Sequence, residues 1–454
     1  MRINENIKSI SGDPKKAIKK LSLPIVLTML LSVANNLVDS IWVSGLGVGP
    51  LAAMGFTTPI FLVLVGIGAG VGAGANSLLS RFVGAEDSKG VNNGAIHSLL
   101  ISIVICIILT VFFAFALEPI LYLMGAGSVI NYGLEYGYII VIFSFTIILP
   151  NVFSGMFRAE GDIKRATLSL ALAAIINLIL NPIFIYTLNL GIKGSAIATV
   201  VASFINLLIF IYWMFIKKDT FFSYDFKNFK YQSKIVKDIL VVSLPASLEE
   251  ILMAVVSIVL NYLVEITGGT IAVASFTAGW RILSMAIIPP LGIAISSITV
   301  VGIAFGAKKF KNLRTSVRYT VKLGLIYSII ITILLFIFAN QISLLFSYST
   351  NSVTISNEIT KFLRIMGLYI IPVAFGTAAA SAFQGMGKGF SSLSITLLRE
   401  VILVSIFAYL FSIVFGFGVL GVYIGLILGD IIGCAIGYIG LEYYIYGLIK
   451  KAKS

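Results

Sequence analysis

The chain has 454 residues, of which 59% are hydrophobic and 11% charged, and its mean hydropathy is +1.05. This composition excludes a soluble globular protein and predicts an integral membrane protein. The formal net charge of +13 would suit nucleic-acid binding, but the basic residues stand in short clusters between apolar segments. That distribution is the positive-inside pattern of membrane proteins, so we expect no nucleic-acid partner.

Apolar segments follow one another along the chain, each long enough to cross roughly 30 Å of hydrocarbon at about 1.5 Å per helical residue. They begin near residues 20, 51, 95, 133, 166, 194, 239, 270, 319, 357, 392 and 420. Between the sixth and the seventh, residues 217–237 are rich in lysine and aromatic residues. We therefore predict an all-α integral membrane protein with twelve transmembrane helices. Six helices form a first lobe in residues 1–216, a cytoplasmic interlobe linker occupies residues 217–237, and six helices form a second lobe in residues 238–454.

The two halves of the chain repeat short sequences at a nearly constant interval. The Ser-Leu-Pro sequence of residues 22–24 returns at residues 243–245, and the Gly-Ala pair of residues 84–85 returns at residues 306–307. A spacing of roughly 220 residues indicates two copies of one membrane bundle, and transporters commonly place a substrate site between two such copies. The repeat therefore predicts two pseudo-symmetric lobes and favours transport as the function.

Lys and Arg residues gather in the N-terminal tail, in every second loop, in the linker and in the C-terminal tail. The positive-inside rule then places both termini in the cytoplasm of a multi-pass protein of the cell (plasma) membrane. The linker alternates aromatic and basic residues over Phe221–Lys227, which is typical of a segment on the inner lipid headgroups; binding of a partner is the alternative. Cys106 and Cys434 lie in separate apolar segments, so we predict packing roles and no disulfide or thiolate metal site.

Glycines recur in the second apolar segment, where Gly66, Gly70 and Gly74 have small-xxx-small spacing. This spacing indicates close helix packing in a membrane, not a phosphate-binding loop, which would need a preceding strand. No G-x-x-x-x-G-K-[ST] sequence is present. We therefore expect an ion gradient, and not ATP bound to this chain, to supply the energy.

An acidic residue stands inside the first apolar segment. Asp39 follows Asn35 and Asn36 by one helical turn, so the three polar side chains share one side of the helix. A carboxylate in hydrocarbon costs about 2.5–3.5 kcal/mol even on lenient scales, so it should face a bundle interior or a wet cavity. The patch could hold a proton, a sodium ion or a cationic group of a substrate; a hydrogen-bonded structural carboxylate is the alternative.

Polar residues repeat at four-residue spacing in the fifth and sixth segments. Asn177 and Asn181 lie on one helical face just before Pro182, which removes a backbone hydrogen bond and bends the helix. Ser195 and Thr199 form a similar hydroxyl pair, for which helix packing is the simpler interpretation when the pair is taken alone.

The second lobe contains weaker candidates. Glu249 follows its proline by one turn, and Asp430 lies among closely spaced glycines. Arg399 and Glu400 project about 100° apart on an α-helix, so we expect each to pair with another helix and interpret both as structural. His97, the single histidine, is interpreted as structural too.

Four short sequences resemble those of multidrug and toxic compound extrusion (MATE) transporters. Leu37–Trp42 resembles the acidic motif of their first helix, and Phe157–Asp162 the turn between their fourth and fifth helices. Leu244–Glu249 resembles the start of their seventh helix, and Phe383–Lys388 the turn after their tenth. The resemblance extends over essentially the whole chain.

The resemblance implies a twelve-helix antiporter whose two lobes surround a central cavity. Such proteins export amphipathic, mostly cationic organic compounds in exchange for H⁺ or Na⁺, with Asp39 as the coupling acid. Asn177, Asn181 and Thr199 match a site of archaeal members, where they would bind Na⁺ with Asp39 if coupling uses sodium. Those relatives carry an acid where this chain has Asn181, so the site here contains one carboxylate. We expect no cofactor beyond the coupling ion. We also expect the protein to be a monomer in contact with membrane lipid.

Two other functions are possible. A lipid-linked oligosaccharide flippase of the same superfamily would need cationic cavity residues for pyrophosphate, and the candidates are Arg281, Arg364 and Arg399. An intramembrane lipid-modifying enzyme would need clustered acid, base and nucleophile groups. One histidine and two separated cysteines supply little of that chemistry, so we predict that the protein is not an enzyme.

Overall fold

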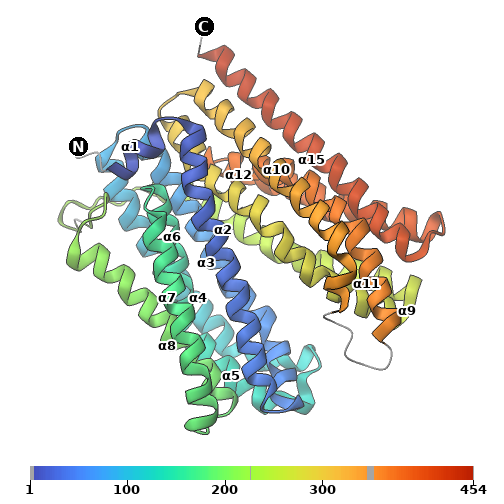
Figure 1. Ribbon diagram of the computed structural model, residues 1–454. Coiled ribbons are helices and arrows are strands. Elements are labelled where there is room, and N and C mark those ends of the chain that lie inside the picture. The colour runs from blue at the N-terminus through green and yellow to red at the C-terminus, as the bar shows by residue number, and fades with distance from the viewer. Residues whose placement is uncertain (1–4, 225, 345–351, 453–454) are drawn as a thin grey trace. The chain divides into compact units, whose positions relative to one another are not determined.

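The computed structural model describes residues 5–224, 226–344 and 352–452, and every regular element in these ranges is a helix (Figure 1). The α-helices in the first half are α1 Glu5–Ser11, α2 Pro14–Ser44, α3 Val48–Gly84, α4 Ser88–Leu123, α5 Ile130–Ile142, α6 Phe145–Ala159, α7 Ile163–Pro182 and α8 Ile192–Ile211. Those in the second half are α9 Ser233–Gly306, α10 Phe310–Leu344, α11 Ser352–Met366, α12 Ile370–Gly385, α13 Gly389–Thr396, α14 Val404–Tyr409 and α15 Gly418–Lys451. The predicted all-α membrane architecture is confirmed.

Within the described residues, 10 helices are long and apolar enough to cross a membrane, or up to 11 when the bent pair of Ala126–Ile142, which includes α5, and α6 counts as one span. One of them, α9, has 74 residues, which is more than three times the roughly 20 that a crossing needs. Its backbone leaves the helical region at Gly269, where φ is 67°, a value that glycine adopts without strain. Two crossings joined at Gly269 agree with the segments expected near residues 239 and 270, and raise the number of spans to the predicted twelve.

The chain forms two compact units. Unit 1 comprises residues 1–9 and 27–247, and unit 2 comprises residues 10–26 and 248–454. The boundary therefore passes through α1 between Ser9 and Ile10, through α2 between Val26 and Leu27 and through α9 between Ser247 and Leu248. None of the three crossings lies in a loop, because each helix continues through the boundary.

Unit 1 owes its tight packing to the glycines of α3. A Cβ atom at Gly72 would lie 2.7 Å from the Asn151 carbonyl oxygen of α6, so α6 approaches on that side. A Cβ atom at Gly70 or Gly74 would lie within about 2.2 Å of the hydroxyl of Ser247 or Ser243 on α9. Small residues at four-residue spacing thus face small residues at four-residue spacing, as the sequence predicted for a close helix contact.

The linker lies on unit 1 and is fastened there by side chains that bond its backbone. The Phe221 N–H donates to Glu160 Oε2 at 2.7 Å, and the Ser223 N–H donates to Asn92 Oδ1 at 2.8 Å. Phe222 is 2% exposed and packs edge-on against Phe157, so this aromatic ring contacts protein and not the headgroup region expected for it. We call residues 219–232 the strap.

His97 holds the far end of the strap. Its Nδ1 lies 2.8 Å from the Asn93 carbonyl oxygen, and its Nε2 accepts a hydrogen bond of 3.0 Å from the Gln232 N–H. A carbonyl can only accept, so Nδ1 carries the proton and Nε2 is unprotonated. The strap is therefore fixed by a neutral imidazole.

Unit 2 is built around α15. Cβ atoms added at Gly425, Gly429 and Gly433 would lie between 2.4 and 2.8 Å from backbone atoms of Ala408, Leu403 and Arg399. These glycines let the segment from α13 to α14 lie directly on α15. The segment includes a π-helix, η6 Leu397–Leu403, which carries two charged residues into the interior.

Candidate ion-coupling site

Asp39 lies in the last third of α2 with 4% of its surface exposed. Its Oδ1 accepts a hydrogen bond of 2.8 Å from Asn181 Nδ2 on α7. Within the described ranges no Lys or Arg forms a salt bridge with it. A carboxylate in this setting is stabilised by an amide alone, which leaves its negative charge uncompensated.

A polar network extends from Asp39 across α7 to α8, two helices that run side by side in Figure 1. Asn181 Nδ2 also donates to Asn177 Oδ1 at 3.0 Å and to the Asn177 carbonyl at 3.1 Å. Asn177 Nδ2 donates to Thr199 Oγ1 at 3.3 Å, and that hydroxyl donates to the Ser195 carbonyl at 3.1 Å. The structure thus brings Asp39, Asn177, Asn181 and Thr199 together.

The helix geometry after Asn181 is irregular. Pro182 cannot donate a backbone hydrogen bond, and the chain continues as a π-helix, η2 Ile183–Thr187, in which the Leu188 N–H donates to the Ile183 carbonyl at 2.9 Å. Such single π-turns are frequent at functional sites of helices. The expected bend at Pro182 therefore takes the form of a widened turn beside the polar network.

One polar atom of this network has no hydrogen-bond partner in the part of the chain that the structure describes. Asn181 is fully buried, and its Oδ1 accepts no hydrogen bond. An unpaired buried acceptor costs about 1–3 kcal/mol. A proton donor or a cation beside Asp39 and Asn181 would remove this cost, so the network can accept one positive charge.

Asn35 and Asn36 take no part in the hydrogen bonds described for Asp39. Asn36 is exposed, and its carbonyl accepts a bond of 3.0 Å from Ser40 Oγ; Asn35 is half-buried. Sharing one side of a helix in sequence did not bring these amides to the carboxylate, because α7 reaches Asp39 from another direction.

Tyr136 was not identified from the sequence. It lies on α5, is 5% exposed, and interacts electrostatically with the Asp39 carboxylate. No local signal could have found it, because the proximity depends on how α2 and α5 are arranged within unit 1.

In unit 2, Glu249 is half-buried and well supplied with donors. Ser392 Oγ donates to its Oε1 at 2.7 Å, and Gln384 Nε2 donates to its Oε2 at 3.2 Å. Asp430 is fully buried and receives Arg399 Nη1 at 2.8 Å.

The expectation that Arg399 and Glu400 do not pair with each other is wrong. Arg399 Nη2 lies 2.5 Å from Glu400 Oε1, and both side chains are buried. Both residues belong to η6, and a π-helix turns less per residue than an α-helix, which brings neighbouring side chains closer. The expected partner on another helix is present as well, since Arg399 binds Asp430 of α15.

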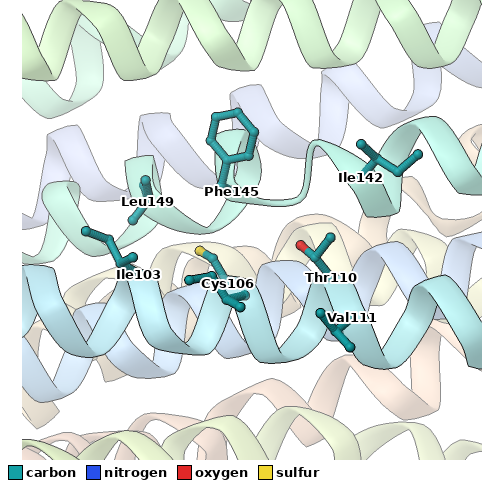
Figure 2. A pocket seen from close by; sticks show the side chains of 8 residues that line it. Ile103, Cys106, Thr110, Val111, Ile142, Phe145 and Leu149 are labelled. Atoms are coloured by element: carbon teal, nitrogen blue, oxygen red, sulfur yellow. The ribbon is translucent and has the colours of Figure 1, made fainter.

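A separate apolar pocket lies between α4 and the break that joins α5 to α6, and Figure 2 shows its lining side chains. Its volume is about 410 Å³. The lining residues are Ile103, Cys106, Ile107, Thr110, Val111, Ile142, Phe145 and Leu149. Thr110 Oγ1 bonds Ser144 Oγ at 2.8 Å, so its polar group is already satisfied. The pocket offers no charge and carries none of the predicted site residues.

Comparison with known proteins decides which family has this arrangement. The MatE family model matches residues 24–183 and 245–410. The chain belongs to the MatE family. A solved outward-facing multidrug resistance MATE transporter of the MOP superfamily is 35% identical, has a TM-score of 0.95, and covers 98% of this chain and 99% of its own.

Two relatives of this chain are both named as transporters, but of different compounds. The multidrug export protein MepA of Staphylococcus haemolyticus is 26% identical over 424 residues, covering 92% of this chain and 91% of its own. A protein named FAD transporter from Shewanella oneidensis is 26% identical over 423 residues, covering 90% of each. The relatives are transporters, and this chain is a multi-span membrane protein of a transporter family.

The two matched MatE segments begin at Pro24 and Pro245, the prolines of the repeated Ser-Leu-Pro sequence. The duplication inferred from the repeated short sequences therefore agrees with two MatE segments, one in each half of the chain. Asp39, Asn177 and Asn181 lie in the first segment, whereas Thr199 and Asp430 lie outside both.

Proposed function

We propose that the protein is a secondary active antiporter that exports amphipathic, mostly cationic organic compounds in exchange for H⁺ or Na⁺. One observation carries the proposal: Asp39 is buried in a membrane helix with an amide donor and no cationic partner in the described parts of the chain. The names of the MepA relatives and of the MATE structure support multidrug export.

Charge neutralisation at Asp39 provides the coupling. A ligand shifts a conformational equilibrium only by its difference in affinity for the two states. The Asp39 carboxylate attracts an ion or a cationic cargo when ionised, and loses that attraction when a proton or Na⁺ is bound. Asn181 serves both forms, because its Nδ2 donates to the carboxylate and its unpartnered Oδ1 can accept from a proton donor or coordinate a cation.

Helix α2 connects this event to the rest of the molecule. Its residues up to Val26 belong to unit 2, and its residues from Leu27, Asp39 included, belong to unit 1. Thr28 Oγ1 lies 3.0 Å from Thr167 Oγ1 of α7 in unit 1, while Gly292 of α9 leaves space for Val26 in unit 2. A change at Asp39 therefore acts on a helix that both units hold.

Sodium would find hard oxygen ligands in the Asp39 carboxylate, the Asn177 and Asn181 amides, and the Thr199 hydroxyl. A proton needs the carboxylate alone. With one carboxylate, the site cannot share a proton between two acids, and this distinguishes it from sites with two.

The flippase alternative is not favoured. Of the three candidate arginines, Arg281 and Arg364 are exposed, and the Arg364 guanidinium lies 5.5 Å from the centre of the Phe336 ring. Arg399 is occupied by two carboxylates. The three do not form a cationic cluster for a pyrophosphate.

The proposed function includes the location, orientation and oligomeric state of the protein. The protein works as a monomer in the plasma membrane in contact with lipid, with both termini in the cytoplasm and no chemical catalysis of its own. The basic N-terminal tail, strap and C-terminal tail support this orientation.

The test is efflux of a fluorescent organic cation from reconstituted vesicles under pH and Na⁺ gradients imposed separately. Wild-type protein should transport under one of the gradients, and Asp39→Asn should lose gradient-driven transport while remaining folded. Glu265→Gln removes an exposed carboxyl of α9 and serves as the control. Undiminished gradient-driven efflux by Asp39→Asn would refute the proposal. A parallel assay with FAD tests whether the cargo is anionic.

A further inference from the structure

A second group of buried charges lies entirely within unit 2 and is not used by the mechanism above. It consists of Arg399 and Glu400 on η6 and Asp430 on α15, with exposed fractions of 5%, 5% and 0%. One positive and two negative charges leave this cluster with a net charge of −1 when all three groups are ionised. A net charge enclosed in a membrane bundle is strongly unfavourable, and one bound proton would neutralise it.

The hydrogen bonds show which carboxyl group is the weaker anion. Both oxygens of Glu400 have a strong donor: Arg399 Nη2 lies 2.5 Å from Oε1, and the Tyr369 hydroxyl donates to Oε2 at 3.1 Å. Among the residues that the structure describes, Asp430 has one strong donor, since Arg399 Nη1 lies 2.8 Å from Oδ1. Its Oδ2 faces the Cys434 thiol at 3.6 Å, and a thiol is a weak donor. Hydrogen bonds to an ionised group favour its charged form, so a bound proton is better placed on Asp430, the carboxyl group with fewer strong donors.

The helices are closely packed around Arg399. A Cβ atom at Gly376 would lie 2.6 Å from Cys434 Sγ and 2.9 Å from Arg399 Cδ, and one at Gly433 would lie 2.7 Å from Arg399 Cβ. Glu249 of α9 is a further acid that interacts electrostatically with Arg399, and its carboxylate accepts hydrogen bonds from Ser392 and Gln384.

We propose that the Arg399–Glu400–Asp430 cluster is a proton-binding site of unit 2, in which a single proton resides on Asp430 Oδ2. The proton is donated towards Cys434 Sγ, and the cluster is then neutral. The site is separate from Asp39 and holds whether or not the protein is an antiporter, because it depends only on the groups packed between η6, α12 and α15.

The test is infrared difference spectroscopy of the purified full chain in lipid, which detects the carbonyl stretch of a protonated carboxyl group and its shift in heavy water. Wild type minus Asp430→Asn should show one such band. Wild type minus Glu400→Gln should show the same band, because removal of the Glu400 charge leaves Arg399 and Asp430 as a neutral pair that needs no proton. Glu265→Gln, at an exposed acid of the same unit, should show no such band.

A thermal series adds a second readout. Rising pH should lower the unfolding temperature of wild type more than that of Asp430→Asn or Glu400→Gln. A band that persists in both variants, or a Glu400→Gln protein that keeps the Asp430 band, would overturn the proposal. The absence at neutral pH of any protonated-carboxyl band in wild type would overturn it without recourse to a variant. None of these readouts measures transport, so a failed efflux assay would leave them unaffected.

Discussion

The two units enclose acids in opposite ways. In unit 1, Asp39 is held by the Asn181 amide and has no cation beside it among the described residues. In unit 2, Asp430 and Glu400 hold Arg399 between them. An amide stabilises a carboxylate without fixing its charge, whereas a guanidinium favours permanent ionisation of at least one partner. The proposed mechanism accordingly assigns an exchangeable positive charge to unit 1, whereas the positive charge in unit 2 is the fixed guanidinium of Arg399.

The largest effect should come from removing the fixed charge. Arg399→Met leaves two carboxyl groups buried without their cation, and breaking a buried pair in this way costs about 3–5 kcal/mol. We expect a large fall in the unfolding temperature of the purified protein. Arg364→Met, which changes an exposed arginine, should be almost neutral. Equal stability of the two variants would show that the cluster is not an ionic core.

The Asn181 amide, which donates to Asp39 in unit 1, should contribute less to stability. Asn181→Ala removes the donor to Asp39 Oδ1 and leaves the carboxyl group without a described hydrogen bond, at a cost of about 1–3 kcal/mol. Coupled efflux should also slow. Asn36→Ala, which removes an exposed amide of α2, should change the free energy of unfolding by less than about 0.5 kcal/mol. A larger loss of stability in Asn36→Ala than in Asn181→Ala would contradict the hydrogen-bond network assigned to Asp39 and Asn181.

Another buried acid, Glu160, lies outside the spans and extends the comparison to pH. Burial raises the pKa of Glu160 to about 8, and the Phe221 N–H opposes this rise. The folded state therefore binds a proton that the unfolded state has lost between about pH 4.5 and 8, so stability falls as pH rises through this window, by up to about 1.4 kcal/mol per pH unit. Glu160→Gln should flatten that part of the stability profile. If stability depended on pH equally steeply in Glu160→Gln and in the control Glu265→Gln, Glu160 would not be the group responsible.

The smallest effect concerns a single hydrogen bond to the strap. His97 Nε2 accepts from the Gln232 N–H at one end of the strap, and His97→Ala removes this bond, worth about 1 kcal/mol. Proteolytic cleavage within residues 219–232 should then become about fivefold faster. Cleavage at the turn around Glu86 should not change. Equal strap cleavage in wild type and His97→Ala would show that this bond does not hold the strap.

Local sequence predicted a good part of this molecule. Hydropathy located the helices, and glycine spacing correctly indicated the close approach of α3 to its neighbours. The four-residue spacing of Asn177 and Asn181 placed both on the face that meets Asp39. These features repeat within a few residues of chain, and the helix converts such repeats directly into a face.

What failed depended on geometry that spacing does not encode. The pairing of Arg399 with Glu400 requires a π-helix, and no residue in Leu397–Leu403 signals one. Asn35 and Asn36 share a side of α2 with Asp39 but not its partners, because the direction from which α7 approaches is a tertiary property. His97 and Glu160 acquire their roles only when the strap, more than sixty residues away in sequence, lies against them.

The chain passes between its units inside α1, inside α2 and inside α9, and the last two passages lie within three residues of the proline in the repeated Ser-Leu-Pro sequence. Each proline lacks the N–H that would extend the helical hydrogen-bond ladder, so a helix is more easily bent there than elsewhere along its length. The duplication therefore placed the same local weakness of the helix beside a unit boundary in each half of the chain.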